Sequence, residues 1–184
     1  SIAIGLWSMA QTVSACNMGI GNYTLYNNTG GTFNVAIGHG SMCYNTTGCN
    51  NIAVGAFSLL CNTSGINNVA IGYTALKCNT SGIYNVAIGV NAMYGNTSGI
   101  YNVGVGVNSL LRNTTGCYNV GVGVNTLRCT DTGTGNAAVG TNALYNNISG
   151  NYNVAIGHYA AYSNSGGCNN VAAGQSALYS NTTG

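Results

Sequence analysis

A strict repeat of 17 residues runs through the chain of 184 residues and constrains its fold more than any other feature. Asparagine returns at residues 17, 34, 51, 68, 85, 102, 119, 136, 153 and 170. The opening unit, 1–16, is one residue shorter, and the last unit, 170–184, has 15 residues. No linker or charge block interrupts these eleven units, so the sequence predicts one repeat domain over 1–184.

The composition of each unit is typical of a β-strand. We number the positions of a unit as columns 1 to 17, beginning at the repeated asparagine. Columns 2 and 4 hold mostly Val or Ile and alternate with small residues in columns 3 and 5. Since 17 residues are too few for two packed helices, the sequence predicts an all-β, single-domain β-solenoid (β-roll) of eleven coils. Residues of the same column in successive coils would then stack about 4.8 Å apart.

The apolar columns predict which side chains form the core. We expect columns 2, 4, 9 and 16 to point inward, with about four apolar side chains per coil. Column 3 contains only Ala and Gly, and in this interpretation it forms a smooth face opposite the core. That face either needs no side chains or allows another chain to approach closely.

Glycine and asparagine predict the turns. Gly in columns 5 and 15 supplies positive φ where the chain changes direction. Asn in columns 1 and 12 tolerates left-handed backbone and can hydrogen bond to its own turn. Stacked Asn side chains are also expected to form amide ladders along the solenoid.

Charged residues make up only 2% of the chain: Lys77, Arg112, Arg128 and Asp131. A single carboxylate leaves no partner for paired acid–base catalysis. Three cations cannot neutralise a run of phosphates, so nucleic acid is not an expected partner. No apolar run approaches about 18 residues, so we expect no membrane-spanning helix.

The residues that could carry catalysis or bind a metal are too far apart. His39 and His158 both fall in column 6, but seven coils, roughly 34 Å, would separate them. We therefore expect no metal site, no cofactor, no catalytic residues and no enzymatic activity.

The eight cysteines allow two interpretations. Cys61 and Cys78 share column 11 in adjacent coils, within the Cα separation of a disulfide, and an oxidising environment would favour that bond. Four others fall in apolar column 16, where a small buried thiol is the expected role: Cys16, Cys49, Cys117 and Cys168.

Sequons for N-glycosylation recur in column 12. They are either polar turns that happen to match the motif or attachment sites for glycans, which would help to solubilise an uncharged rod. The candidate residues are Asn45, Asn62, Asn79, Asn96, Asn113, Asn147 and Asn181.

Tyrosines gather in columns 10 and 17. Such stacks either pack as surface ladders or present an aromatic stripe to a lateral partner or ligand. The candidates for that stripe are Tyr94, Tyr145, Tyr162 and Tyr179.

Neither end unit carries the polar, atypical sequence that usually caps a solenoid. Ser1 stands in column 1 and Gly184 in column 15, so one chain stacked on the next would continue the coil with little offset. The chain is therefore either part of a longer repeat protein or a unit that polymerises head to tail. The residues expected at that junction are Ile2, Ala3, Ile4, Val171, Ala173 and Leu178.

Units such as 68–84, which reads NVAIGYTALKCNTSGIY, resemble the VAIG-type repeats of trimeric autotransporter adhesin heads. They are also similar to the NVAIGYxALxxNTTG repeats of phage tail fibres and large microbial surface proteins. The resemblance covers the whole chain and implies a left-handed β-roll, often trimeric, on extracellular fibres used for adhesion. It implies no catalytic residues.

Two functional hypotheses follow. The first is a structural protein whose β-solenoid protomers stack head to tail into an extracellular filament, with the chain itself as partner. The second is the repeat head region of a homotrimeric adhesin or phage tail fibre, on a cell or virion surface, that binds a receptor or glycan. An ice-binding solenoid is disfavoured because Thr and Ser are adjacent in columns 13 and 14 rather than two residues apart.

Overall fold

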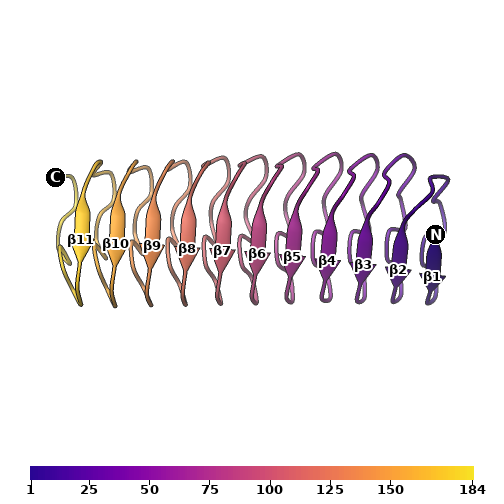
Figure 1. Cartoon of the computed structure of the whole chain (residues 1–184), viewed down its shortest axis with the longest axis horizontal. Coiled ribbons are helices and arrows are strands. Elements are labelled where there is room, and N and C mark those ends of the chain that lie inside the picture. Colours follow the sequence, from indigo (N-terminus) through magenta and orange to yellow (C-terminus); the bar gives the residue numbers. More distant parts are fainter.

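The computed structural model describes residues 1–184 and shows a β-solenoid with eleven strands, one per repeat unit, and no helix. Its coils lie side by side along a rod with the termini at opposite ends (Figure 1). The all-β solenoid predicted from the 17-residue repeat is therefore confirmed. The strands are β1 (Ile2–Ile4), β2 (Met18–Ile20), β3 (Val35–Ile37), β4 (Ile52–Val54), β5 (Val69–Ile71), β6 (Val86–Ile88), β7 (Val103–Val105), β8 (Val120–Val122), β9 (Ala137–Val139), β10 (Val154–Ile156) and β11 (Val171–Ala173).

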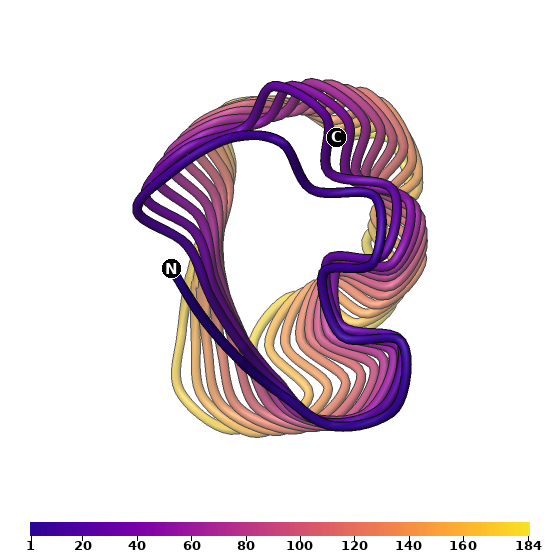
Figure 2. The ribbon, with the colours of Figure 1, turned by 90° about the vertical axis from the view of Figure 1, so that its right-hand side faces the viewer.

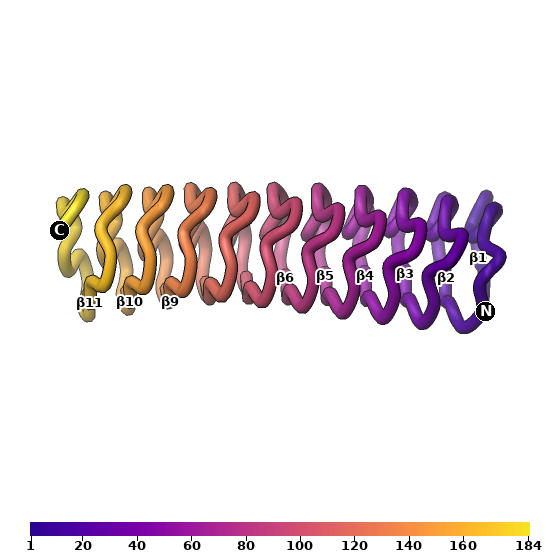
Figure 3. The backbone as a smooth tube through the Cα atoms, turned by 90° about the horizontal axis from the view of Figure 1, so that it is seen from above, coloured from indigo at the N-terminus to yellow at the C-terminus, as the bar shows by residue number.

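All strands belong to one parallel sheet in chain order. Each pairing joins equal columns; in β5 and β6, for example, Val69 lies opposite Val86 and Ile71 opposite Ile88. Viewed along the rod, the same closed outline repeats with a small progressive rotation (Figure 2), and the view from above shows the same regular stack (Figure 3). The constant repeat length sets this register, because a shift would bring unlike columns together.

The strands face the opposite way from the prediction. Their middle residues in column 3, such as Ala70 and Ala87, are fully buried, whereas columns 2 and 4 are half-buried or exposed. The reason is the narrow interior: a Cβ added to Gly104 in column 3 would lie 2.9 Å from Met93 Cγ. Only Ala or Gly fits there, so column 3 is the inside of the coil and neither a smooth outer face nor a surface for another chain.

The core lies between column 3 and the opposite Leu and Met side chains of column 9, as expected for column 9. The predicted inward position of column 16 is wrong: Ile66, Ile83 and Ile100 are only half-buried, and Cys168 is exposed. The buried column 9 residues are Leu25, Met42, Leu59, Leu76, Met93, Leu110, Leu127, Leu144 and Ala161.

The two glycine columns serve different purposes. Gly72 in column 5 has a φ of 137°, as predicted, and an added Cβ would lie 2.4 Å from the Gly89 carbonyl oxygen. Column 15 does not adopt positive φ, contrary to expectation. There, a Cβ on Gly65 would lie 2.3 Å from Asn62 Oδ1, so glycine is needed for space.

Left-handed backbone occurs instead at columns 7, 9 and 17, mostly in residues other than glycine. In one interior coil these are Thr74, Leu76 and Tyr84, with φ of 54°, 51° and 57°. Cys16, with φ of 62°, matches column 17 and not column 16 as assigned from the sequence. The residue missing from the first coil (1–16) therefore belongs to the turn before Cys16.

Candidate functional site: asparagine ladders and end coils

The column 1 asparagines form an unbroken ladder inside the rod, as predicted, although their backbone is not left-handed. In the middle of the rod, Asn85 donates from its backbone N–H and from Nδ2 to Asn68 Oδ1, at 3.0 and 3.2 Å. Its Nδ2 also donates to the Gly99 carbonyl oxygen at 2.8 Å. These contacts join two successive coils, close the coil of Asn85 onto itself, and satisfy polar groups that the closed coil removes from water.

A second ladder follows column 12. Asn79 Nδ2 donates to Asn62 Oδ1 at 2.8 Å and to the Gly82 carbonyl oxygen of its own turn at 3.1 Å. Thr130 interrupts this ladder in the eighth coil, and neither Thr130 Oγ1 nor Asn113 Oδ1 has a hydrogen-bond partner. A threonine has no amide to donate, so the neighbouring oxygen is left buried and unpaired. The exception at column 12 is visible in the sequence, but its consequence follows only from the burial of the ladder.

Six of the seven sequon asparagines lie inside the folded rod. The side chains of Asn45, Asn62, Asn79, Asn96, Asn113 and Asn147 are fully buried, and their Nδ2 atoms donate inside the coil. A glycan attached to Nδ2 has no space there. Asn181, in the last coil, is the one sequon residue of this set that is partly exposed.

All eight cysteines are free thiols, so the disulfide predicted between Cys61 and Cys78 is not formed in the structure. Cys61 lies between Cys43 and Cys78, a grouping that column numbers alone did not indicate. Burial raises the pKa of the Cys43 and Cys78 thiols, and negative charge on Cys61 raises both pKa values further. These thiols are therefore weaker nucleophiles at neutral pH than an isolated cysteine.

The column 10 tyrosines stack on the outside of the rod. The ring centroid of Tyr162 lies 5.0 Å from that of Tyr145 and 5.1 Å from that of Tyr179, and the rings are stacked in both pairs. Desolvation, and then the charges of its neighbours, raise the pKa of the Tyr162 hydroxyl. Tyr94 lies apart from this stack, with Lys77 Nζ 5.3 Å from its ring centroid.

The end coils carry open hydrogen-bonding groups in a defined pattern. Between the last two coils, the N–H groups of Val154, Ala161 and Ser163 donate to the following coil at 2.8, 2.8 and 3.0 Å. The same columns in the final coil are Val171, Leu178 and Ser180, and their N–H groups donate to no backbone carbonyl in the chain.

The first coil offers the matching groups. Inside the rod, columns 5 and 7 donate backward, as Gly21 N–H does to the Ile4 carbonyl oxygen at 2.7 Å and Tyr23 N–H does to that of Leu6 at 2.9 Å. In the first coil these columns are Gly5 and Trp7.

The residues predicted for a head-to-tail junction lie on these two end coils and are exposed. Exposed fractions are 50% for Ile2, 58% for Ile4, 71% for Val171 and 45% for Leu178. Ala3 and Ala173 are exposed as well; column 3, to which Ala3 belongs, is buried inside the rod, whereas column 4, to which Ala173 belongs, is half-buried or exposed there too.

His39 and His158 lie in different coils, on β3 and β10 turns, and each packs against aromatic neighbours. His, Cys, Asp and Glu side chains nowhere gather in threes in a way that would hold a metal ion. No part of the chain forms an apolar helix of the length needed to cross a lipid bilayer. Comparisons with protein-family models, curated proteins and solved structures find no match to this chain.

Proposed function

We propose that this chain is a non-enzymatic structural protein whose rods stack head to tail into an extracellular filament. The observation that supports this proposal is the complementarity of the end coils. A first coil placed against the final coil would offer the carbonyl groups of Ser1, Ser8 and Ala10 to three open N–H groups. It would in turn donate from Gly5 and Trp7, as interior coils do.

Backbone hydrogen bonds and the burial of apolar side chains would both stabilise such a junction. Each of these five backbone hydrogen bonds contributes about 0.5–1.5 kcal/mol net. Burial of exposed Ile2, Ile4 and Val171 side chains adds roughly 25 cal/mol per Å² of apolar surface. The contact joins unlike ends of the molecule, so it propagates into an open filament. With charged residues at 2%, little electrostatic repulsion opposes assembly.

Electron microscopy of the purified chain tests the proposal. We expect unbranched filaments with an axial repeat near 50 Å, which is eleven strands at about 4.8 Å each. Val171→Pro removes one N–H from the open end without removing a bond inside the rod, and should abolish or shorten the filaments. Val171→Ala keeps that N–H and serves as the matched control. Monomeric rods at all concentrations, or filaments unaffected by Val171→Pro, would overturn the proposal.

A second candidate, the repeat head of a trimeric adhesin or phage tail fibre, is favoured by one observation. The outward columns 2 and 4 form an apolar stripe along the sheet, with Ile71, Val139 and Ile156 exposed by 39%, 44% and 52%. Exposed apolar surface of this extent is typical of a protein–protein interface. Discrete three-fold particles in the same micrographs would favour this candidate over the filament.

A further inference from the structure

The four charged residues of the chain all lie in one region. Lys77 and Arg128 occupy column 10, Arg112 occupies column 11 and Asp131 column 13, all within four consecutive coils. Because the rest of the rod carries no Lys, Arg, Asp or Glu, these four side chains make one of its sides the only charged surface.

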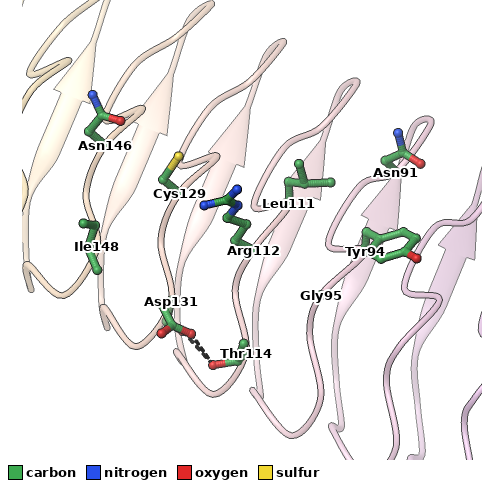
Figure 4. Close-up of a pocket in the computed structure, with 10 residues that line it drawn as sticks. All are labelled: Asn91, Tyr94, Gly95, Leu111, Arg112, Thr114, Cys129, Asp131, Asn146 and Ile148. Atoms are coloured by element: carbon green, nitrogen blue, oxygen red, sulfur yellow. Dashed lines mark hydrogen bonds between the residues drawn. The ribbon is translucent and has the colours of Figure 1, made fainter.

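A groove of about 850 Å³ lies on this surface, within the size range of ligand-binding pockets. It crosses four coils, from Tyr94 to Ile148 (Figure 4). Gly95 and Cys129, small residues of column 11, both line the groove, whereas another interior coil holds Tyr44 in that column.

The cations around the groove differ in what they contact. Arg128 Nη1 donates to the Tyr145 hydroxyl at 2.7 Å, and Lys77 Nζ donates to the Tyr94 hydroxyl at 3.5 Å. Arg112 is exposed, lines the groove and forms no ion pair or side-chain hydrogen bond. Its guanidinium therefore presents its donors to whatever occupies the groove.

The remaining lining combines one acid, two amides and apolar side chains. Thr114 Oγ1 donates to Asp131 Oδ1, which leaves the second carboxylate oxygen free to accept (Figure 4). Asn91 and Asn146 stand at opposite ends of the groove, and Leu111 contributes apolar surface between them.

We propose that this groove binds an acidic oligosaccharide, a chain of sugars carrying carboxylates. Arg112 pairs with a sugar carboxylate, because a guanidinium matches carboxylate geometry with two parallel hydrogen bonds. Asp131 accepts from a hydroxyl, and the amide of Asn146 contacts a hydroxyl further along, whereas the amide of Asn91 is already bonded to Thr74 and Asn108. Tyr94 and Leu111 cover the apolar faces of the sugar rings. A densely charged phosphate polymer fits less well, because Asp131 would repel it.

Because the groove crosses the sixth to ninth coils, it lies away from the end coils and the stripe of columns 2 and 4. Binding does not depend on whether rods stack into filaments, so the two proposals can fail separately.

Isothermal titration calorimetry with tri-galacturonate as the probe and uncharged galactotriose as its neutral counterpart tests this inference. We expect saturable binding of the acidic trimer and at least about 10-fold weaker binding of the neutral one. Arg112→Gln should weaken binding of the acidic trimer by about 10-fold or more. Arg128→Gln removes the same charge from a residue already paired with Tyr145, and should change affinity by less than about 3-fold.

A second variant keeps the test informative if Arg112→Gln perturbs the rod. Cys129→Tyr fills the groove with a side chain that column 11 accommodates at Tyr44, and it should abolish binding while the circular dichroism spectrum stays unchanged. The proposal is overturned if tri-galacturonate does not bind saturably, if both arginine variants lose affinity equally, or if Cys129→Tyr binds as the parent chain does.

Discussion

The first coil and the interior coils stack in the same register although their ladder residues differ. At columns 1 and 12 the first coil has Ser1 and Thr12, whereas the coil at 68–84 has Asn68 and Asn79. Nevertheless β1 pairs with β2 in the same way as every interior pair, with Ile2 opposite Met18. Because the first coil is also one residue shorter, backbone strand pairing holds the register there without a constant repeat, and the asparagines serve the interior polar groups.

A single hydroxyl replaces the missing asparagines at this end. Ser14 Oγ accepts from Asn17 Nδ2 at 3.2 Å and from Asn28 Nδ2 at 2.9 Å, so both ladders end on one residue. The first strand is exposed at all three positions, whereas the middle residues of β2 to β11 are buried. The first coil is thus a partial cap for side chains but not for the backbone.

The largest difference between the two regions should appear in column 3. Ala87→Leu places three additional carbons against the buried Met and Leu side chains, and we expect it to destabilise the rod by about 3 kcal/mol. Ala3→Leu makes the same change in the first coil, where column 3 is exposed, and should cost less than about 0.5 kcal/mol. Urea denaturation followed by circular dichroism measures both. Equal effects would contradict the inward orientation of column 3.

A smaller difference is expected in the ladders. Asn79→Ala leaves Asn62 Oδ1 buried without a donor and removes one acceptor of Asn96 Nδ2, and should cost about 2 kcal/mol. Ser14→Ala removes an acceptor at the exposed end, where water replaces it, and should cost less than about 1 kcal/mol. Hydrogen exchange should show faster opening around residues 62–96 in the first variant and only near the first coil in the second. A Ser14→Ala effect as large as that of Asn79→Ala would mean that the ladders depend on their end.

Much of the fold was predictable because the repeat is strict. The period gave the solenoid, and the amide ladders followed from Asn in columns 1 and 12. Hydrophobicity did not predict which strand residues point into the core, since Val and Ile in columns 2 and 4 suggested that these columns point inward. In a three-residue strand within so narrow a coil, the Leu and Met side chains of column 9 decide the facing, because they leave room only for Ala or Gly opposite.

The candidate sites were less predictable, for a different physical reason. Sequons at residues such as Asn62 and Asn96 are local patterns, and the burial that prevents modification arises only when neighbouring coils stack. The grouping of Cys43 with Cys61 likewise depends on side chains from different columns meeting on one surface. The groove at Arg112 is lined by small residues two coils apart in one column, Gly95 and Cys129, and no local sequence pattern marks that surface.

The smallest expected effect concerns the interruption at Thr130, which breaks the column 12 ladder in the interior as Thr12 does at the end. Thr130→Asn supplies an amide to Asn113 Oδ1, now buried without a partner, and an acceptor for Asn147 Nδ2. We expect a gain of about 1 kcal/mol in the free energy of unfolding, because a buried unpaired oxygen is satisfied. Thr132→Asn, at an exposed site in the same turn, is the matched control and should change stability by less than about 0.5 kcal/mol. Loss of stability in Thr130→Asn would show that the eighth coil has closed around threonine and no longer accommodates the ladder that its neighbours share.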